Sequence, residues 1–462
     1  MPETITLSFS QCANQLTTHF NNTQSARLFR DPSRSDAFIH ILPKSNQNSR
    51  TISNLYPRSI LYDYSNGSGA LDPYTYFEEK PEIKTSFEII QTLPSISMTE
   101  FQKNVQNGII DGNGINGQRT SYWSDFSKVT YDPRAVITHP TYVYDEQTGE
   151  GRGKNLPDSK FQLHEIGVES FNNVNKIRDS VDDIVRKMFE NSGNVNQLNS
   201  VVELDSSWSG VCSESLKYII DDQLDGKSSK IVLWSLQRDT KYVDDMNLVS
   251  KMDRIEKLIT FANLDLSGIV MMNLDIDIGS NSLWEKTAFL SVPYDQFNDV
   301  ELNCDLTEIM YKLTDSSSKN FITNIDILWN DDSIQKMGVN GIFITQQQRK
   351  PHIFSKSIVK SIEDCKDFSK CSDNTPKYLI NEYKLRHEYE YVDSMPEIMK
   401  NRKPLASSLS VDDTLKTDFT NMKNYVSRYC RNDKREELKD TLDNLREAYI
   451  NGFEFSDEED DY

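Results

Sequence analysis

Three glycines have the spacing of a dinucleotide-binding loop: Gly112, Gly114 and Gly117. Such a loop needs a strand before it and a helix after it, because the helix N-terminus receives the pyrophosphate. Residues 118–123, which follow the glycines, do not open an amphipathic helix. We therefore interpret the glycines as part of a flexible loop, not as a dinucleotide site.

The residues that could act as nucleophiles or metal ligands lack the neighbours in sequence that nucleophilic catalysis or zinc binding requires. Ser209 has no histidine nearby in the sequence, and Cys212 is better explained as a small packed residue. The six histidines include no pair at HxxxH or HExxH spacing, and the six cysteines include no CxxC pair. The sequence therefore predicts no zinc site, and it favours free thiols in a reducing compartment over a disulfide framework.

Length and charge narrow the class of protein. A chain of 462 residues suffices for two or three domains, or for one large α/β body with a second layer. The formal net charge of -20 disfavours binding to nucleic acid or to an anionic membrane surface, and favours protein partners. No apolar run is long enough to span a bilayer. The N-terminus has neither an apolar signal core nor the Arg-rich pattern of a matrix-targeting segment.

Hydrophobic periodicity predicts alternating strands and helices over the first 273 residues. Strands are expected at 5–9, 58–63, 201–204, 230–236 and 268–273, and helices at 174–190, 216–224 and 248–259. A turn at 11–14, a short helix through Leu16 and Phe20, and loops at 65–69 and 205–212 are also expected. Residues 100–122 are expected to form a long surface insertion or the border between two blocks. The alternation implies an α/β fold with a largely parallel sheet and helices on both faces.

The pattern beyond residue 300 is less regular and predicts a second α+β region. A strand is expected at 342–344 and a loop at 361–376. Two long amphipathic helices are expected at 415–429 and 438–449. The acidic end of the chain, residues 456–462, has no apolar surface to bury and is expected to be disordered.

Three motifs, in this order, resemble the tubulin superfamily. Gln11-Cys12-Ala13-Asn14-Gln15 is similar to the loop after the first tubulin strand. Residues 57–63, ending at Asp63, resemble the next tubulin strand, and residues 179–187 resemble the helix before the phosphate loop. Two further blocks, 123–126 with 133–136 and 208–211, resemble the Misato family, called Misato-like in fungi.

The resemblance implies a tubulin-like fold and a division of the chain. The expected parts are an N-terminal tubulin-like segment at 1–118 (Misato segment II), a tubulin-like domain at 119–300, a C-terminal α+β region at 301–450 and an acidic tail at 451–462. The family is implicated in mitochondrial distribution and morphology and in inheritance of the mitochondrial genome. Expected partners are proteins at the cytosolic face of mitochondria, with tubulin or the chaperonin as further possibilities, and the expected location is the mitochondrial periphery and the cytoplasm.

The same resemblance marks a vestigial nucleotide site at Gln11, Cys12, Asp63, Ser209, Gly210 and Asn273. Tubulins hold phosphates with a glycine-rich loop, whose backbone N–H groups can approach the ligand closely. Here Trp208 and Cys212 stand where glycines are expected. The site is therefore expected to be degenerate, with no catalytic residue, no metal and no bound cofactor.

Three functions stay open from the sequence. The first is a non-enzymatic protein of mitochondrial inheritance. The second is a divergent GTP-binding GTPase that forms filaments, and the third is a tubulin-biogenesis factor that acts with the chaperonin. For Gln11, Cys12 and Asn14 the alternatives are an inherited strand-to-helix turn or a weakened nucleotide site.

Overall fold

A computed structural model describes most of the chain. The described residues are 3–30, 38–41, 54–71, 96–108, 120–193, 195–224, 230–238, 242, 245–264, 266–276, 278–279, 282–301, 304–314, 319–339, 342–343, 351–361, 379–431 and 433–450. The predicted glycine loop at 112–117 and the predicted acidic tail lie outside these residues, as does nearly all of the predicted loop at 361–376.

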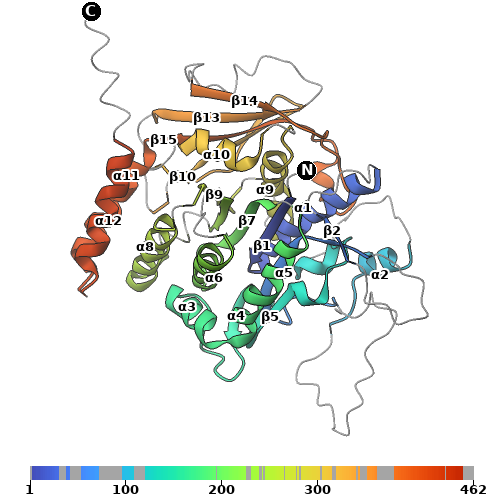
Figure 1. The fold of residues 1–462 in the computed structure, drawn as a ribbon, viewed down its shortest axis with the longest axis horizontal. Coiled ribbons are helices and arrows are strands. Elements are labelled where there is room, and N and C mark those ends of the chain that lie inside the picture. Colours follow the sequence, from blue (N-terminus) through green and yellow to red (C-terminus); the bar gives the residue numbers. More distant parts are fainter. Residues whose placement is uncertain are drawn as a thin grey trace, which may run out of the picture.

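An eight-stranded sheet forms the centre of the molecule (Figure 1), with the strand order β10-β9-β8-β7-β1-β4-β5-β6. Its strands are β1 (Glu3–Phe9), β4 (Ser59–Ser65), β5 (Val136–Asp145), β6 (Glu150–Gly153), β7 (Val195–Glu203), β8 (Ile231–Gln237), β9 (Gly268–Asn273) and β10 (Phe321–Ile322). All neighbouring pairs are parallel except β5 with β6. The predicted, largely parallel sheet is thereby confirmed.

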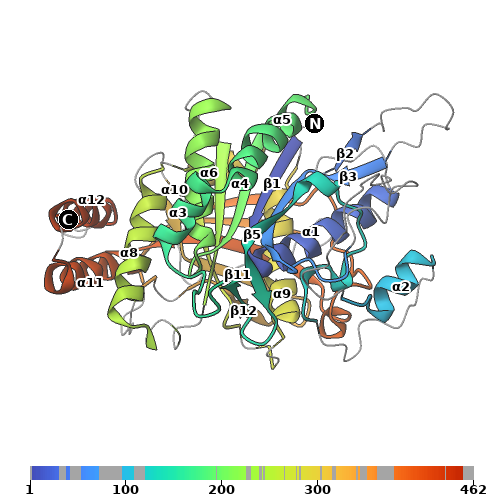
Figure 2. The ribbon, with the colours of Figure 1, turned by 90° about the horizontal axis from the view of Figure 1, so that it is seen from below.

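Helices cover both faces of this sheet, as predicted (Figures 1 and 2). One face carries α3 (His164–Asn173), α4 (Asn175–Ser180), α5 (Arg186–Glu190), α6 (Trp208–Asp222) and α8 (Leu248–Ala262). One π-helical turn, Val181–Val185, joins α4 to α5, so the helix predicted at 174–190 is confirmed. The other face carries α1 (Gln11–Arg30), α9 (Leu283–Asn298) and α10 (Leu306–Thr314).

A second sheet packs over α9 and α10 and makes the outer layer (Figure 1). Its order is β12-β11-β15-β13-β14, with bounds Ile334–Lys336, Asn324–Trp329, Pro404–Asp412, Ile353–Lys360 and Ile380–Lys384. The layers are thus helices, central sheet, helices and second sheet. The predicted second α+β region is confirmed.

The two predicted C-terminal helices are confirmed as α11 (Thr414–Tyr429) and α12 (Arg435–Ala448). They form a hairpin beside α8, which was not predicted. Tyr449, which follows α12, is fully buried. Its hydroxyl accepts from the N–H of Phe321 at 3.1 Å and lies 3.3 Å from the carbonyl oxygen of the same residue. The hairpin thereby satisfies the outward backbone groups of the short edge strand β10.

Smaller elements join these layers. They are β2 (Phe38–Ile41), β3 (Asn54–Pro57), α2 (Glu100–Gln106) and three 3₁₀ turns at Trp123–Phe126, Pro133–Ala135 and Glu397–Met399. The helix α2 lies within the segment 100–122, where a long surface insertion or a border between two blocks was expected. Thr99 starts it, because its side chain accepts the N–H of Gln102 while the Gln102 side chain accepts the N–H of Thr99.

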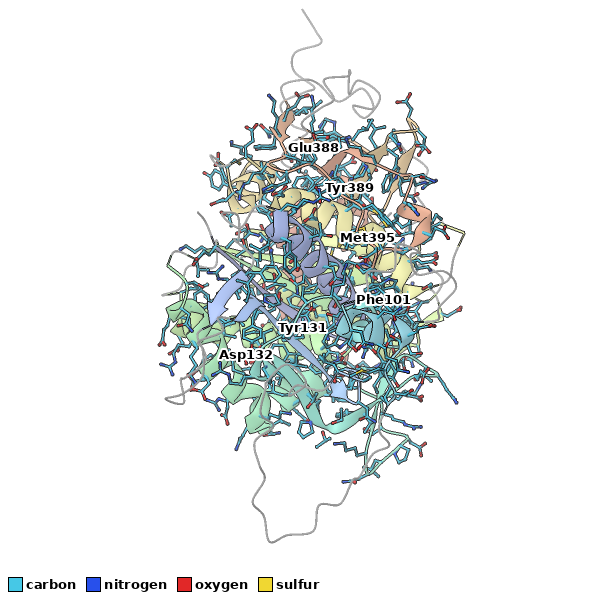
Figure 3. The ribbon with its side chains drawn as sticks, turned by 90° about the vertical axis from the view of Figure 1, so that its right-hand side faces the viewer. Phe101, Tyr131, Asp132, Glu388, Tyr389 and Met395 are labelled. Atoms are coloured by element: carbon cyan, nitrogen blue, oxygen red, sulfur yellow. The ribbon has the colours of Figure 1, made fainter. Side chains whose placement is uncertain are left out.

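The segment after β14 returns from the second sheet to the N-terminal elements. The Asn22 amide donates to Ser394 Oγ at 2.9 Å, and the Trp284 indole donates to the carbonyl oxygen of Ser394 at 3.2 Å. Figure 3 shows the labelled residues of this segment, Tyr389 and Met395, above Phe101 on one face of the molecule. Residues far apart in the sequence are therefore tied together around α1.

Candidate functional site

The turn after β1 is made by a single residue, Ser10. Its backbone has a φ of 110°, its Oγ accepts the N–H of Ala13 at 3.2 Å, and its carbonyl oxygen accepts the N–H of Asn14 at 2.9 Å. The prediction of a turn at 11–14 is therefore wrong, because these residues already form the first turn of α1.

Gln11 and Asp63 lie together, as the resemblance implies, and they bind each other. Gln11 Nε2 donates to Asp63 Oδ2 at 2.9 Å and also donates to the carbonyl oxygen of Gly67. The Trp123 indole donates to the same Asp63 oxygen at 2.7 Å, and the Trp123 N–H donates to Gln11 Oε1 at 3.3 Å. All three side chains are buried. The polar atoms of Gln11 are therefore engaged by protein groups.

Burial raises the pKa of the Asp63 carboxyl to about 7, against the lowering effect of its hydrogen bonds with the Tyr64 N–H and Trp123. Trp123 was not predicted as part of this site. A signal existed in the sequence, since residues 123–126 form one of the blocks that resemble the Misato family. Nothing in the sequence alone placed that block against Asp63.

Cys12 lies beside Gln11 but offers no reactive thiol. Its side chain is buried, and burial together with the negative charge of Glu203 holds the pKa of the thiol well above its usual value. A thiol in this state is mostly protonated at neutral pH and is a poor nucleophile.

The loop predicted at 205–212 is too long: residues 205–207 form a turn, but 208–212 already belong to α6, which begins at Trp208. The Trp208 ring is fully buried and packs on Phe161 and Tyr64, with ring centroids 5.2 and 5.3 Å away. The N–H of Ser207, just before the helix, donates to the carbonyl oxygen of Phe161 at 3.2 Å. In the segment that resembles the tubulin phosphate loop, Trp208 is thus a bulky buried side chain. The N–H of Ser207 in the same segment is already bound to a protein carbonyl.

Ser209 and Cys212 have structural roles within α6. Ser209 Oγ donates to the carbonyl oxygen of Ser206 at 2.7 Å. The Cys212 sulfur lies 3.2 Å from Ser200 Oγ, and burial raises the pKa of its thiol to about 12. Cys212 is a packed residue, as the sequence suggested.

Gly210 is required for helix packing. A methyl group at its Cα would lie 2.2 Å from the carbonyl oxygen of His164, and one at Gly167 would lie 1.9 Å from the carbonyl oxygen of Ser207. The helices α3 and α6 therefore cross at two glycines with almost no space between their backbones. This close contact explains the need for glycine at position 210.

We expect Gly210→Ala to lower the free energy of unfolding by about 1–3 kcal/mol, because the helices must separate to admit the methyl group. Gly193→Ala is the matched control, since a methyl group there would have no heavy atom within 4 Å. Urea denaturation of both variants measures the difference. Equal stability of the two variants would contradict the assignment of Gly210 to helix packing.

The carboxyl edge of the sheet next to Trp208 carries an ion-pair network. Arg238 donates to Glu203 at 2.9 Å and to Glu150 at 3.0 Å, and its backbone N–H donates to Asp205 at 3.1 Å. The guanidinium group of Arg254 pairs with Asp205, and both side chains are almost fully buried. The acidic neighbours keep the pKa of Arg238 above its usual value, despite burial. Both arginines are therefore already bound to carboxylates.

The network continues to the C-terminal hairpin. Arg254 Nε donates to the carbonyl oxygen of Ile342 at 3.0 Å, and the Ile342 N–H donates to Asp418 of α11. The strand predicted at 342–344 is wrong for the described Ile342 and Phe343, which form a bend. Side chains satisfy the backbone of Ile342, so it needs no neighbouring strand.

The raised pKa of Asp418 leads us to expect that the free energy of unfolding depends on pH. Burial raises the pKa of its carboxyl to about 7, so between about pH 4 and pH 7 the folded chain binds more protons than the unfolded chain. Its contribution to stability therefore falls as the pH rises to about 7 and is constant above it. The free energy of unfolding of the wild-type chain should fall between pH 5.5 and pH 8. In Asp418→Asn we expect this fall to be smaller by about 2 kcal/mol. Urea denaturation at both pH values tests this, and an unchanged loss in the variant would contradict it.

Asn273 does not join the other predicted site residues. It ends β9, and the strands β7 and β8 separate β9 from β1 and Gln11. Its side-chain oxygen accepts the N–H of Asp275 at 2.8 Å, and its own N–H donates to the carbonyl oxygen of Met337 at 2.9 Å. The side chain therefore closes a local turn.

These residues differ from a phosphate-binding loop in packing and in charge. Trp208 is fully buried in the segment that resembles the tubulin phosphate loop, and the buried side chains of Asp63, Glu203 and Asp205 lie at the same edge of the sheet. A triphosphate would add negative charge there, with Arg238 and Arg254 already engaged. Among the described residues there is no cluster of three histidine, cysteine or acidic side chains that could hold a metal ion. Within the same residues, no helix has the length and apolar character to span a membrane.

Comparison with known proteins agrees with this architecture. Residues 2–110 match the family described as the Misato Segment II tubulin-like domain, and residues 114–301 match a tubulin domain family. Similar proteins are Protein DML1 of Debaryomyces hansenii, with 26% identity over 99% of both chains, and Protein DML1 of Yarrowia lipolytica, with 24% identity over the full length of both. Protein dml1 of Aspergillus niger is 23% identical over 98% of both chains. The predicted tubulin-like fold is confirmed.

Proposed function

Because the chain belongs to the Misato family of tubulin-like proteins, we propose that it serves mitochondrial inheritance as a non-enzymatic protein. In this role it takes part in the distribution and morphology of mitochondria and in the partitioning of their genome at division. The resemblance to the Misato family supports the biological role, and the geometry around Trp208 supports the absence of enzymatic activity.

The buried Trp208 is the observation that carries the non-enzymatic proposal. Phosphate loops depend on backbone N–H groups that the ligand can approach closely. Here the corresponding segment begins a helix, and its first side chain is a fully buried indole that packs on Tyr64 and Phe161. We expect isothermal titration with GTP and magnesium to give no binding heat. A measured affinity together with turnover would favour a divergent GTPase instead.

The proposed partners are proteins at the cytosolic face of mitochondria, and the proposed location is the mitochondrial periphery and the cytoplasm. The net charge of -20 supports protein partners over nucleic acid, because a polyanion would be repelled. Depletion of the protein, followed by microscopy of mitochondria and of their DNA in dividing cells, tests the role. We expect daughter cells that lack mitochondria or mitochondrial DNA, and normal partition after complete depletion would refute the proposal.

A further inference from the structure

Two lysines are hydrogen-bonded to β5, near the edge of the central sheet that β5 and β6 form. Lys154 follows β6, and its N–H donates to the carbonyl oxygen of Thr141 at 2.9 Å. Lys176 lies in the first turn of α4, and its Nζ donates to Thr138 Oγ1 at 2.7 Å. Thr138 and Thr141 both belong to β5. These four residues form what we call the rim patch.

The rim patch differs from its surroundings in having no carboxylate partner. Within the described parts of the chain, neither Lys154 nor Lys176 forms an ion pair. The other cations of the same hairpin do, since Arg152 lies 3.8 Å from Asp145 and Lys160 lies 3.8 Å from Glu150. The two lysines therefore bring positive charge to this edge of a chain with 71 acidic and 51 basic residues.

The positive charges of the rim patch lower the pKa values of neighbouring basic groups. Burial and the nearby Lys154 lower the pKa of Lys176. Burial, followed by the two lysines, lowers the pKa of His139 to about 4. His139 lies between the patch and Trp208, its Nδ1 is 3.2 Å from the N–H of Thr141, and its ring is buried. No carboxylate is among the groups that act on Lys176 or His139, so a bound anion would relieve this repulsion.

We propose that the rim patch is a docking site for an acidic segment of a partner protein. Lysines are flexible point charges that suit the carboxylates of an extended peptide, whereas phosphate groups are held best by the rigid fork of arginine. The net charge of -20 on the whole chain repels large polyanions and anionic bilayers. A short acidic peptide interacts mainly with the charges nearest to it, because salt screens the more distant ones. Leu156, which is 71% exposed and two residues after Lys154, offers an apolar contact beside the charges.

The proposal is independent of where the protein acts and can be tested with purified full-length chain. The probe is a fluorescein-labelled peptide of glutamate and aspartate with one leucine, followed by fluorescence anisotropy at low and at physiological salt. The test variant carries Lys154→Glu and Lys176→Glu. The control variant carries Lys312→Glu and Lys439→Glu, which change the net charge equally at lysines already paired with Glu308 and Glu436. Circular dichroism of each variant confirms that it is folded.

We expect the wild-type chain to bind the peptide more weakly as salt increases, and the Lys154/Lys176 variant to lose at least about tenfold in affinity, which corresponds to about 1.4 kcal/mol. The control variant should lose much less. Equal losses in the two variants, or no binding by the wild-type chain, would overturn the proposal. Binding of vesicles of anionic phospholipid through the same two lysines, without peptide binding, would show a lipid site and would overturn it as well.

Discussion

Trp208→Ala is expected to lower the free energy of unfolding by about 3–5 kcal/mol, the range for removal of a fully buried large aromatic side chain. The indole is in contact with the rings of Tyr64 and Phe161, and its removal leaves a cavity that the first turn of α6 cannot close. The loss includes both the apolar surface of the ring and the cavity that remains. Urea denaturation monitored by circular dichroism measures it.

Two further variants make this prediction specific. Tyr311→Ala is the aromatic control, because the Tyr311 side chain is 62% exposed and its removal should change stability by less than about 0.5 kcal/mol. Trp208→Gly restores the residue that a phosphate loop would carry. We expect it to be at least as unstable as Trp208→Ala and to show no stabilisation by GTP. A rise in melting temperature with GTP would mean that the indole is the sole barrier to nucleotide binding.

Much of the fold could be predicted because hydrophobic periodicity survives in the elements that line the core. The strand β9 has the predicted bounds, and the two C-terminal helices lie within a few residues of theirs. The strand β7 was predicted too short, at 201–204. It begins at Val195. Its polar residues Gln197 and Asn199 are buried, and each donates a hydrogen bond of 2.7 Å to the side chain of Asn298. These amide side chains interrupt the apolar pattern that indicates a strand. Their hydrogen-bond partner lies about a hundred residues away in the sequence, so the pattern alone could not show that they are buried.

The candidate site could be predicted only in part, for similar reasons. The resemblance brought Gln11 and Asp63 together correctly, but their third partner, Trp123, comes from a separate segment. Residues 205–212 are rich in serine and contain a glycine, which is typical of a loop, yet Gly210 allows close packing of α3 and α6. Local composition cannot distinguish these two uses of glycine, because the decisive contact is with a backbone in another helix.

The ion pair of Arg254 with Asp205 was not predicted, and its disruption gives the second large expected effect. Arg254→Met should lower the free energy of unfolding by about 3–5 kcal/mol, because it leaves the Asp205 carboxylate buried without its cation. The same change removes the hydrogen bond of 3.0 Å to the carbonyl oxygen of Ile342, which connects the edge of the sheet to α11. Urea denaturation measures the loss, and hydrogen exchange should show faster exchange in α11.

The double variant Arg254→Met with Asp205→Asn separates the two causes of this loss. If an unpaired buried charge dominates, neutralising Asp205 should restore most of the stability, since buried ion pairs often contribute little beyond satisfying each other. The surface pair Lys312–Glu308 is the control, because Lys312→Met should cost less than about 1 kcal/mol. No recovery in the double variant would instead assign the loss to the missing contact with Ile342. A cost for Arg254→Met as small as that of the surface control would contradict the role of this pair in joining the carboxyl edge of the central sheet to the C-terminal hairpin.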